Sequence, residues 1–365
     1  MKILIYSWPY WPLIGGVEVT SRMLARTLVE LGHTVIVFTS TPTRGHIELT
    51  EGYIIYRSTN LLTFIRLART AELVLIKGGV SAFAGLGAML GCVPRIIIWH
   101  EMTGPYEHLG NTWKVRTTNF IRRLVARRAC AHVGVTQACL DSKSILERPK
   151  GRNNRVIYNP VSEELDTAAK APESSPRKVD ILFVGRLIEG KGILVLAEAL
   201  CKLDQDGYSL RVRIVGDGGD RERMETSLRD VRTLSVTFAG SETGEALAQS
   251  YASARVLVVP TTHPEGMGMV VAEGMAFGLP VIVSDQAALK EVVGNAGIIV
   301  RNGDAEDLAS AVRNVLGDKQ LWQCLSDRAR CQSKMFSMSN FRRSVADLLG
   351  NVSNQTAGAG IADVT

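Results

Sequence analysis

Short runs of aliphatic and β-branched residues alternate with longer segments of helical spacing along almost the whole chain. Several runs, such as 34–39 and 73–77, are apolar almost throughout, which is typical of parallel strands covered on both faces. The pattern predicts successive βαβ units and therefore an α/β fold of doubly wound parallel sheets. The predicted strands are Lys2–Ser7, Thr34–Thr39, Tyr53–Arg57, Leu73–Lys77, Arg95–His100, His132–Thr136 and Arg155–Asn159, then Asp180–Gly185, Arg211–Gly216, Ser235–Gly240, Arg255–Thr261, Pro280–Asp285 and Gly297–Val300.

A polar segment at 162–179 interrupts this series, has two prolines and shows no strand pattern, so it predicts a linker. The chain of 365 residues has the length of two domains of about 150 residues each. We expect a Rossmann-like domain over 1–165, a linker over 166–178 and a second Rossmann-like domain over 179–330. A helix over 331–350 is expected to pack back on the first domain, and 351–365 to form a flexible tail.

Composition places the chain among globular proteins, with 46% hydrophobic and 21% charged residues. The longest apolar stretch, 80–93, is shorter than the roughly 18 to 20 residues of a membrane span, so it predicts a buried helix. The N-terminal apolar run meets Pro9 and Pro12 at once, unlike a signal peptide. Six scattered cysteines without a CxxC pair indicate a reducing compartment and no zinc site. We therefore expect a cytoplasmic protein.

Charge divides the chain unevenly. Residues 1–161 hold 20 Lys and Arg against 9 Asp and Glu, a net charge of +11, whereas the remainder carries −5. This asymmetry predicts that the first half faces something anionic, such as a membrane, a phospholipid-linked substrate or nucleic acid.

The basic residues concentrate in 108–140, which has no Asp or Glu. They accompany an apolar stripe of Trp113, Phe120, Ile121, Leu124 and Val125, so the segment predicts a basic amphipathic helix that lies on an anionic leaflet. The alternative is a solvated helix that packs on its own sheet. Nucleic acid is not expected, because no nucleic-acid motif is present. The basic residues are Lys114, Arg116, Arg122, Arg123, Arg127 and Arg128.

Glycines follow the first predicted strand. Gly15 and Gly16 precede a helix that begins near Val17, an arrangement that lets a backbone approach a phosphate at the positive end of the helix dipole. The strict GxGxxG fingerprint of a dinucleotide site is absent, which disfavours a nicotinamide dehydrogenase. The alternative is an ordinary βα turn.

A stronger signal lies in the second half, where Glu265 precedes a predicted helix and Glu273 follows eight residues later. The helix N-terminus near Gly268 favours an anion, and a carboxylate two turns into the helix suits the vicinal diol of a ribose. The residues around the two glutamates are apolar or small, which disfavours a solvated surface helix. Two carboxylates beside a phosphate site suit a sugar joined to a nucleotide.

Two cations follow the first strand of the second domain. Arg186 and Lys191 stand at its carboxyl end, where open α/β sheets bind ligands. The guanidinium group offers two donors to phosphate oxygens and the ammonium group a point charge. A cationic pair that faces a helix N-terminus predicts a diphosphate site, and the alternative is a surface loop with ordinary charges.

These motifs together resemble the retaining glycosyltransferases of family four, which have the GT-B fold of two Rossmann-like doubly wound domains facing a central cleft. The resemblance covers nearly the whole chain and is carried by Gly15-Gly16, by Gly185-Arg186 to Lys191-Gly192, and by the Glu-x7-Glu element from Glu265 to Glu273. It implies an acceptor-binding first domain and a nucleotide-sugar-binding second domain.

The resemblance also implies roles for single residues. Glu265 contacts the donor sugar hydroxyls, Glu273 the ribose, and Arg186 and Lys191 the diphosphate. His100 resembles the family's histidine near the sugar's O6 and the acceptor; a structural histidine is the alternative. Backbone amides that hold the sugar and phosphate come from Met267, Gly268 and Met269, and Gly15 and Gly16 allow the first domain to close on the donor.

The family chemistry implied is transfer with retention from a nucleotide-diphosphate sugar, a UDP-sugar or GDP-mannose, without a metal or other cofactor. The implied acceptor is a glycan or a lipid-linked carrier in the synthesis of an exopolysaccharide or of a cell-envelope glycan such as lipopolysaccharide, at the inner face of the plasma membrane. Two alternatives stay open: a hydrolysing nucleotide-sugar 2-epimerase of the same fold, and a sugar-nucleotide-binding protein without transferase activity. The Asp204-Gln-Asp206 triplet follows a predicted helix and is interpreted as a turn rather than a metal site.

Overall fold

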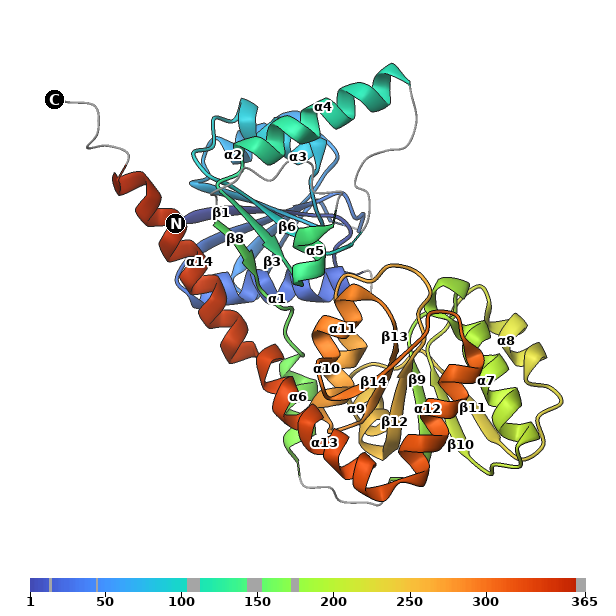
Figure 1. Cartoon of the computed structure of the whole chain (residues 1–365). Coiled ribbons are helices and arrows are strands. Elements are labelled where there is room, and N and C mark those ends of the chain that lie inside the picture. The colour runs from blue at the N-terminus through green and yellow to red at the C-terminus, as the bar shows by residue number, and fades with distance from the viewer. Residues whose placement is uncertain (13–14, 44, 104–111, 143–152, 172–176, 359–365) are drawn as a thin grey trace. The chain divides into compact units, whose positions relative to one another are not determined.

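The structure is a computed structural model that describes residues 1–12, 15–43, 45–103, 112–142, 153–171 and 177–358 (Figure 1). The chain forms two compact units. The first contains 1–159 together with 339–365, and the second contains 160–338.

The first unit is built on an eight-stranded sheet with the order β3-β4-β2-β1-β5-β6-β7-β8. Neighbouring strands are parallel except β3, which pairs antiparallel with β4 at one edge. The interior strands are buried along nearly their whole length, as their apolar sequences predict. The strands are β1 (Lys2–Ser7), β2 (Thr34–Thr39), β3 (Ile47–Thr50), β4 (Tyr53–Arg57), β5 (Leu73–Lys77), β6 (Ile96–His100), β7 (Ala131–Gly134) and β8 (Asn153–Val156).

Side-chain caps define where most helices of this unit begin. The side chains of Asn60, Ser81, Thr112 and Thr136 accept hydrogen bonds from backbone N–H groups of the first turn that would otherwise lack partners. The helices are α1 (Gly16–Glu30), α2 (Leu61–Ala68), α3 (Ala82–Leu90), α4 (Trp113–Arg128), α5 (Gln137–Asp141) and α14 (Met338–Gly358), of which α14 joins this unit from Ser339 onward.

Two glycines of α3 bring its neighbours close. A Cβ atom at Gly85 would lie 2.2 Å from Val125 Cγ2 of α4, and one at Gly87 would lie 2.4 Å from Phe64 Cδ1 of α2. Within the apolar stretch 80–93, the helix spans 82–90, and only one side of it is buried, since Leu90 at its end is 51% exposed. Its glycines admit larger side chains from both neighbouring helices. Because Val125 fills this space, the opposite side of α4 faces outward.

The second unit is built on a six-stranded, fully parallel sheet with the order β11-β10-β9-β12-β13-β14. The first strand in the chain, β9, lies in the middle, and the chain builds outward from it in both directions. The strands are β9 (Val179–Val184), β10 (Arg211–Val215), β11 (Ser235–Gly240), β12 (Ala254–Val259), β13 (Val281–Ser284) and β14 (Gly297–Val300).

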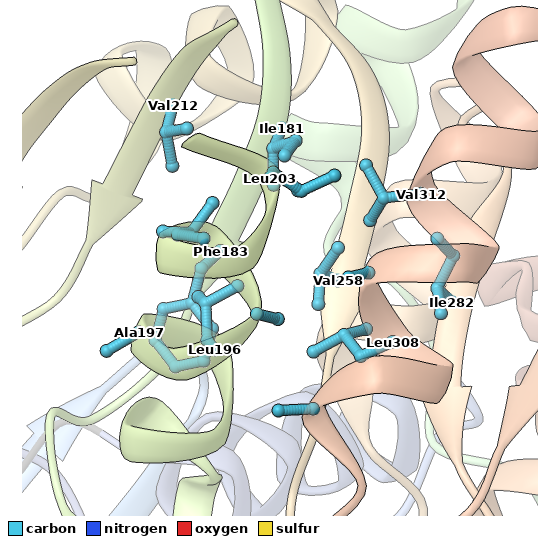
Figure 2. Close-up of a cluster of buried hydrophobic side chains, with 14 of the residues drawn as sticks. Ile181, Phe183, Leu196, Ala197, Leu203, Val212, Val258, Ile282, Leu308 and Val312 are labelled. Atoms are coloured by element: carbon cyan, nitrogen blue, oxygen red, sulfur yellow. The ribbon is translucent and has the colours of Figure 1, made fainter. Parts of the chain in front are cut away.

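A hydrophobic cluster joins this sheet to α7 and α12 (Figure 2). Phe183 and Val258 of the sheet meet Leu196 of α7 and Leu308 of α12, and all four are at most 2% exposed. The helices of the unit are α6 (Glu163–Lys170), α7 (Ile193–Gln205), α8 (Arg221–Ser227), α9 (Gly244–Ser253), α10 (Met269–Ala276), α11 (Ala287–Val293), α12 (Ala305–Gly317) and α13 (Lys319–Ser333), with short 3₁₀ turns at Glu189–Lys191 and Lys334–Phe336.

The structure differs from the sequence prediction at several boundaries. The chain passes between the units at 159/160 and 338/339, not at 165/166 and 330/331, and α6 forms where the linker was expected to begin. Ser162 caps α6, which packs on α9 and α10. The last helix continues to 358, beyond the expected start of the tail at 351. In the described part of the chain no helix is both long and apolar enough to cross a membrane.

Strand β3 was not predicted, because its four residues alternate between exposed and partly buried and form only an edge pairing. Strand β8 begins at Asn153, two residues before the predicted run 155–159. Both strands lie at an edge of the sheet, where burial imposes the weakest apolar pattern.

A glycine contact fixes the turn between β9 and α7. Gly192 is the N-cap of α7 and has a φ of 72°, and a Cβ atom there would lie 1.8 Å from the carbonyl oxygen of Pro260, in the loop after β12. Backbone cannot yield to such an approach as a flexible side chain does. These two loops therefore depend on glycine at position 192.

Gly192→Ala should lower the free energy of unfolding by about 3 kcal/mol or more, because it adds this collision to the strain of a left-handed backbone. Gly207→Ala is the matched control, since Gly207 has a φ of 78° and nothing within 4 Å of a Cβ atom. It should cost only about 1 to 2 kcal/mol. Urea unfolding followed by circular dichroism measures both; equal costs would contradict the proposed contact.

Candidate functional site

The carboxyl ends of β9 and β12 form the switch point of the second sheet. Strand β9 is followed in the chain by β10 on one side, whereas β12 lies on its other side. Connections therefore leave these two neighbouring strands in opposite directions, and open α/β sheets bind ligands at such a point. Two loops lie there, 185–192 after β9 and 260–268 after β12.

The carbonyl group of Gly190 joins these two loops. It accepts hydrogen bonds from Thr261 Oγ1 at 2.8 Å, Thr262 N at 3.1 Å and His263 N at 3.2 Å. A Cβ atom at Gly190 would lie 2.0 Å from His263 Nδ1, so a larger residue there would displace the exposed His263 side chain. The residues that follow in each loop are consequently held side by side.

Lys191 and Glu265 form an ion pair across the two loops. Their side chains are 29% and 18% exposed, so the pair is partly open to solvent. Thr261 Oγ1 lies 3.4 Å from the same Glu265 oxygen. Arg186 is exposed, and in the part of the chain that the structure describes no carboxylate lies within ion-pair distance of it. The loops thus contain two cations, Lys191 in an ion pair with Glu265 and Arg186 exposed to solvent.

Helix α10 begins in the second of these loops. Its N-cap, Gly268, has a φ of 72° and supplies no side-chain hydrogen bond, and a Cβ atom there would lie 2.4 Å from Leu289 Cδ2. Met267 is 3% exposed and anchors the loop, and Met269 is the first helical residue. The N-terminus of α10 thus carries its positive dipole end without a side-chain cap.

Glu273 lies one turn inside α10 and has a buried partner. The Tyr251 hydroxyl group of α9 donates a hydrogen bond of 2.7 Å to Glu273 Oε2, and Tyr251 is fully buried. Burial raises the pKa of Glu273, and the hydrogen bond from Tyr251 lowers it. Sequence reasoning missed Tyr251, because its place in an ordinary amphipathic helix carries no signal of a partner 22 residues away.

The structure places the other predicted site residues in the first unit. Gly16 is the first residue of α1, and Gly15 is its N-cap in an extended conformation. A Cβ atom at Gly15 would lie 2.5 Å from a carboxylate oxygen of Glu18, the far end of a flexible side chain. This helix N-terminus therefore already faces a negative charge, and the role of the two glycines in donor closure stays a prediction.

His100 ends β6 and is fully buried. Its Nε2 atom lies 3.0 Å from His132 Nδ1, and His132 Nε2 donates to the carbonyl oxygen of Ala126 at 3.0 Å. The next residue, Glu101, pairs with buried Lys77 and accepts a hydrogen bond of 2.9 Å from Asn159. His100 thus belongs to a buried polar network around the carboxyl ends of β5, β6 and β7, and its contact with a sugar stays a prediction.

Helix α4 contains most of the predicted basic segment, and it has one face exposed to solvent and one face packed on the core. Trp113, Phe120 and Leu124 are 72%, 66% and 48% exposed. Their spacing places them on one face of the helix. The expected stripe was wrong in part, because Val125 lies in the core and Ile121 packs against it. Among the predicted basic residues, Arg122 is half-buried, and the exposed ones are Lys114, Arg116, Arg123, Arg127 and Arg128.

The Asp204-Gln-Asp206 triplet stabilises a turn at the end of α7, and the sequence predicts a turn at this position. Asp204 Oδ1 accepts hydrogen bonds from the backbone N–H of Arg232 and from Thr233, and Asp206 pairs with Arg313. Within the described residues, no group of three or more His, Cys, Asp or Glu side chains is placed to hold a metal ion.

Several solved structures share this fold. Sucrose-phosphate synthase of Thermosynechococcus elongatus superposes with a TM-score of 0.74 at 19% identity, covering 97% of this chain and 99% of that one. HepE of Anabaena in complex with UDP gives a TM-score of 0.73 at 16% identity, covering 96% and 100%.

Curated proteins are related in sequence as well. The chain is 27% identical over 274 residues to a sulfoquinovosyl transferase of Arabidopsis thaliana, a match that covers 71% of this chain and 52% of that protein. It is 26% identical over 377 residues to glycogen synthase of Mycobacterium tuberculosis, covering 90% and 89%.

Two family models match most of the sequence. Residues 14–165 match the model described as Glycosyltransferase Family 4, and 178–318 match the model described as Glycosyl transferases group 1. The matches correspond to the two sheet-based units and include the loops that carry Lys191 and Glu265. The chain belongs to the family-4, group 1 glycosyltransferases and has the GT-B fold.

Proposed function

We propose that the chain is a retaining, metal-independent glycosyltransferase whose donor is a nucleotide-diphosphate sugar, a UDP-sugar or GDP-mannose. The observation that carries the proposal is the switch point of the second sheet, where Lys191, Glu265 and the uncapped N-terminus of α10 meet. A cation and a helix N-terminus favour a diphosphate, and partly exposed carboxylates favour hydroxyl groups. HepE, which shares the fold, is described in complex with UDP and with UDP-glucose, in keeping with this proposal.

Each residue of this site has a proposed role. Arg186 and Lys191 bind the diphosphate oxygens, with the backbone amides of Met267, Gly268 and Met269 at the start of α10. Glu265 accepts hydrogen bonds from the sugar hydroxyls, and Lys191 leaves its ion pair with Glu265 when the diphosphate arrives. Glu273 accepts the two ribose hydroxyls one turn further along the helix.

The reaction proceeds at the anomeric carbon of the donor sugar. Its bond to the diphosphate oxygen breaks, the sugar acquires oxocarbenium character, and the acceptor oxygen forms the new bond on the same face. The leaving diphosphate takes the acceptor's proton, so atoms and charge balance without a covalent enzyme intermediate. Arg186, Lys191 and the dipole of α10 stabilise the charge that develops on the leaving group, which is the work a metal ion does in other enzymes.

The proposed acceptor is a glycan or a lipid-linked carrier of cell-envelope or exopolysaccharide synthesis, reached from the cytoplasmic side of the membrane. The net charge of +11 over 1–161 and the exposed basic face of α4 support an anionic partner for the first unit. Nucleic acid is not part of the proposal.

Substitutions at the two glutamates test the assignment. Glu273→Ala should weaken binding of the free nucleoside diphosphate about tenfold, because it removes the ribose acceptor. Glu265→Ala should not weaken that affinity, because it releases Lys191 from its ion pair. It should lower the transfer rate about a hundredfold, because the proposed partner of Glu265 is the sugar. Calorimetry and a transfer assay separate the two effects.

The same assays discriminate the rival functions. Donor turnover to an epimerised free sugar without an acceptor would indicate the 2-epimerase, and donor binding without any turnover would indicate a binding protein. Both variants with wild-type affinity and rate would show that the site is assigned wrongly. Glu245→Ala, at an exposed position in the first turn of α9, is the matched control.

We also propose that α4 binds an anionic membrane surface, with its exposed aromatic and aliphatic face entering the interface. The stripe of Trp113, Phe120 and Leu124 is flanked on both sides by exposed cations, as an interfacial helix requires. Each cation near an anionic surface contributes about 1 kcal/mol.

Binding to phosphatidylglycerol vesicles tests this surface. The double variant Phe120→Ser/Leu124→Ser and the double variant Arg123→Glu/Arg127→Glu should each reduce sedimentation with the vesicles at least about tenfold. Leu62→Ser, at a position 75% exposed on α2, should not. Equal binding of all three variants and the wild type would contradict the proposal.

A further inference from the structure

Tyr251 is a buried titratable residue that the proposed mechanism does not yet use. It lies on α9, is fully buried, and stacks on Phe277 with ring centroids 5.4 Å apart at 20°. Its hydroxyl group donates to Glu273 Oε2 at 2.7 Å. The ring is thus fixed by packing, and its one polar atom is aimed at the carboxylate assigned to the ribose.

We propose that Tyr251 is a positioning residue that orients the Glu273 carboxylate for a vicinal diol. The inference rests on the proposed function, because it gives the nucleoside part of the donor its recognition geometry. A carboxylate oxygen has two acceptor sites. The Tyr251 hydroxyl group fills one site of Oε2 and leaves Oε1 and the second site of Oε2 for two adjacent hydroxyl groups.

The protonation states agree with this geometry. Burial and the neighbouring carboxylate raise the pKa of Tyr251, so the phenol keeps its proton and remains a donor. Burial raises the pKa of Glu273, and the hydrogen bond from Tyr251 acts against that rise. Tyr251 therefore favours the ionised form of Glu273, the form that accepts hydrogen bonds from both hydroxyl groups.

In the described part of the chain, no charged side chain near α10 binds Glu273 in place of Tyr251. The elements that pack against α10 are α6, α11, α13, β12 and β13, and α9 approaches through Tyr251. Among the residues that the structure describes, none of their charged side chains forms an ion pair or hydrogen bond with Glu273. These side chains are Glu163, Glu164, Asp166, Lys170, Glu245, Arg255, Lys290, Glu291, Lys319, Asp327, Arg328 and Arg330.

Tyr251→Phe tests the inference in the full chain, because it removes the hydroxyl group and keeps the packed ring. Calorimetry measures binding of two probes, the nucleoside diphosphate that the wild type prefers among UDP, GDP and ADP, and inorganic pyrophosphate. We expect Tyr251→Phe to weaken nucleoside diphosphate binding about tenfold and to change pyrophosphate binding less than about twofold. Tyr208→Phe, at an exposed turn after α7, is the matched control and should change neither.

A pH series adds a readout that packing alone would not move. Nucleoside diphosphate binding should weaken as the pH falls through the pKa of Glu273, because protonation removes an acceptor. Tyr251→Phe removes a contact that lowers this pKa, so its binding should weaken at a higher pH than in the wild type. In the neutral Glu273→Gln background, Tyr251→Phe should have little further effect.

The outcomes separate the possible failures. Unchanged nucleoside diphosphate binding in Tyr251→Phe, or equal loss of both probes, would overturn the positioning role. Failure of the wild type to bind any nucleoside diphosphate would overturn the proposed function and, with it, this inference. If Tyr251→Phe does not fold, Glu273→Asp replaces it by withdrawing the carboxylate from the hydroxyl group. It should show the same selective tenfold loss, and wild-type binding would contradict the inference.

Discussion

The carbonyl group of Gly190 accepts three hydrogen bonds from the loop after β12, and the candidate site depends on this contact. It brings the chain after β9 against the chain after β12 at the switch point of the second sheet. Glycine at 192 is required, because a side chain there would collide with the backbone carbonyl group of Pro260 in the opposite loop. Lys191 and Glu265 face each other as a consequence. Backbone contacts between the two loops therefore position the charged side chains of the candidate site.

The sequence predicts most elements of the second unit, because parallel strands that are buried on both faces consist of nearly continuous apolar residues. The predicted strands of the second unit match the structure within a few residues, and Lys191 and Glu265 lie together at the expected strand ends. Tyr251 could not be predicted, since its role depends on the register between α9 and α10. The approach of Gly192 to Pro260 was equally hidden, because it joins residues far apart in the chain.

The first unit was less predictable at its polar positions. A stretch of basic and apolar residues indicates an amphipathic helix, but only the packing of Val125 against Gly85 determines which side of α4 faces outward. His100 lies at the predicted strand end, yet the structure connects it to His132 instead of exposing it. The boundary between the units was placed too late, because α6 is polar enough in sequence to resemble a linker.

The most direct test of the account is the position of the diphosphate in a crystal structure of the wild-type chain with its preferred nucleoside diphosphate. The account predicts that phosphate oxygens lie within hydrogen-bond distance of Arg186, Lys191 and the backbone amides at the start of α10, with the ribose on Glu273. A nucleotide bound anywhere else, or at this sheet edge with its ribose away from Glu273, would contradict it.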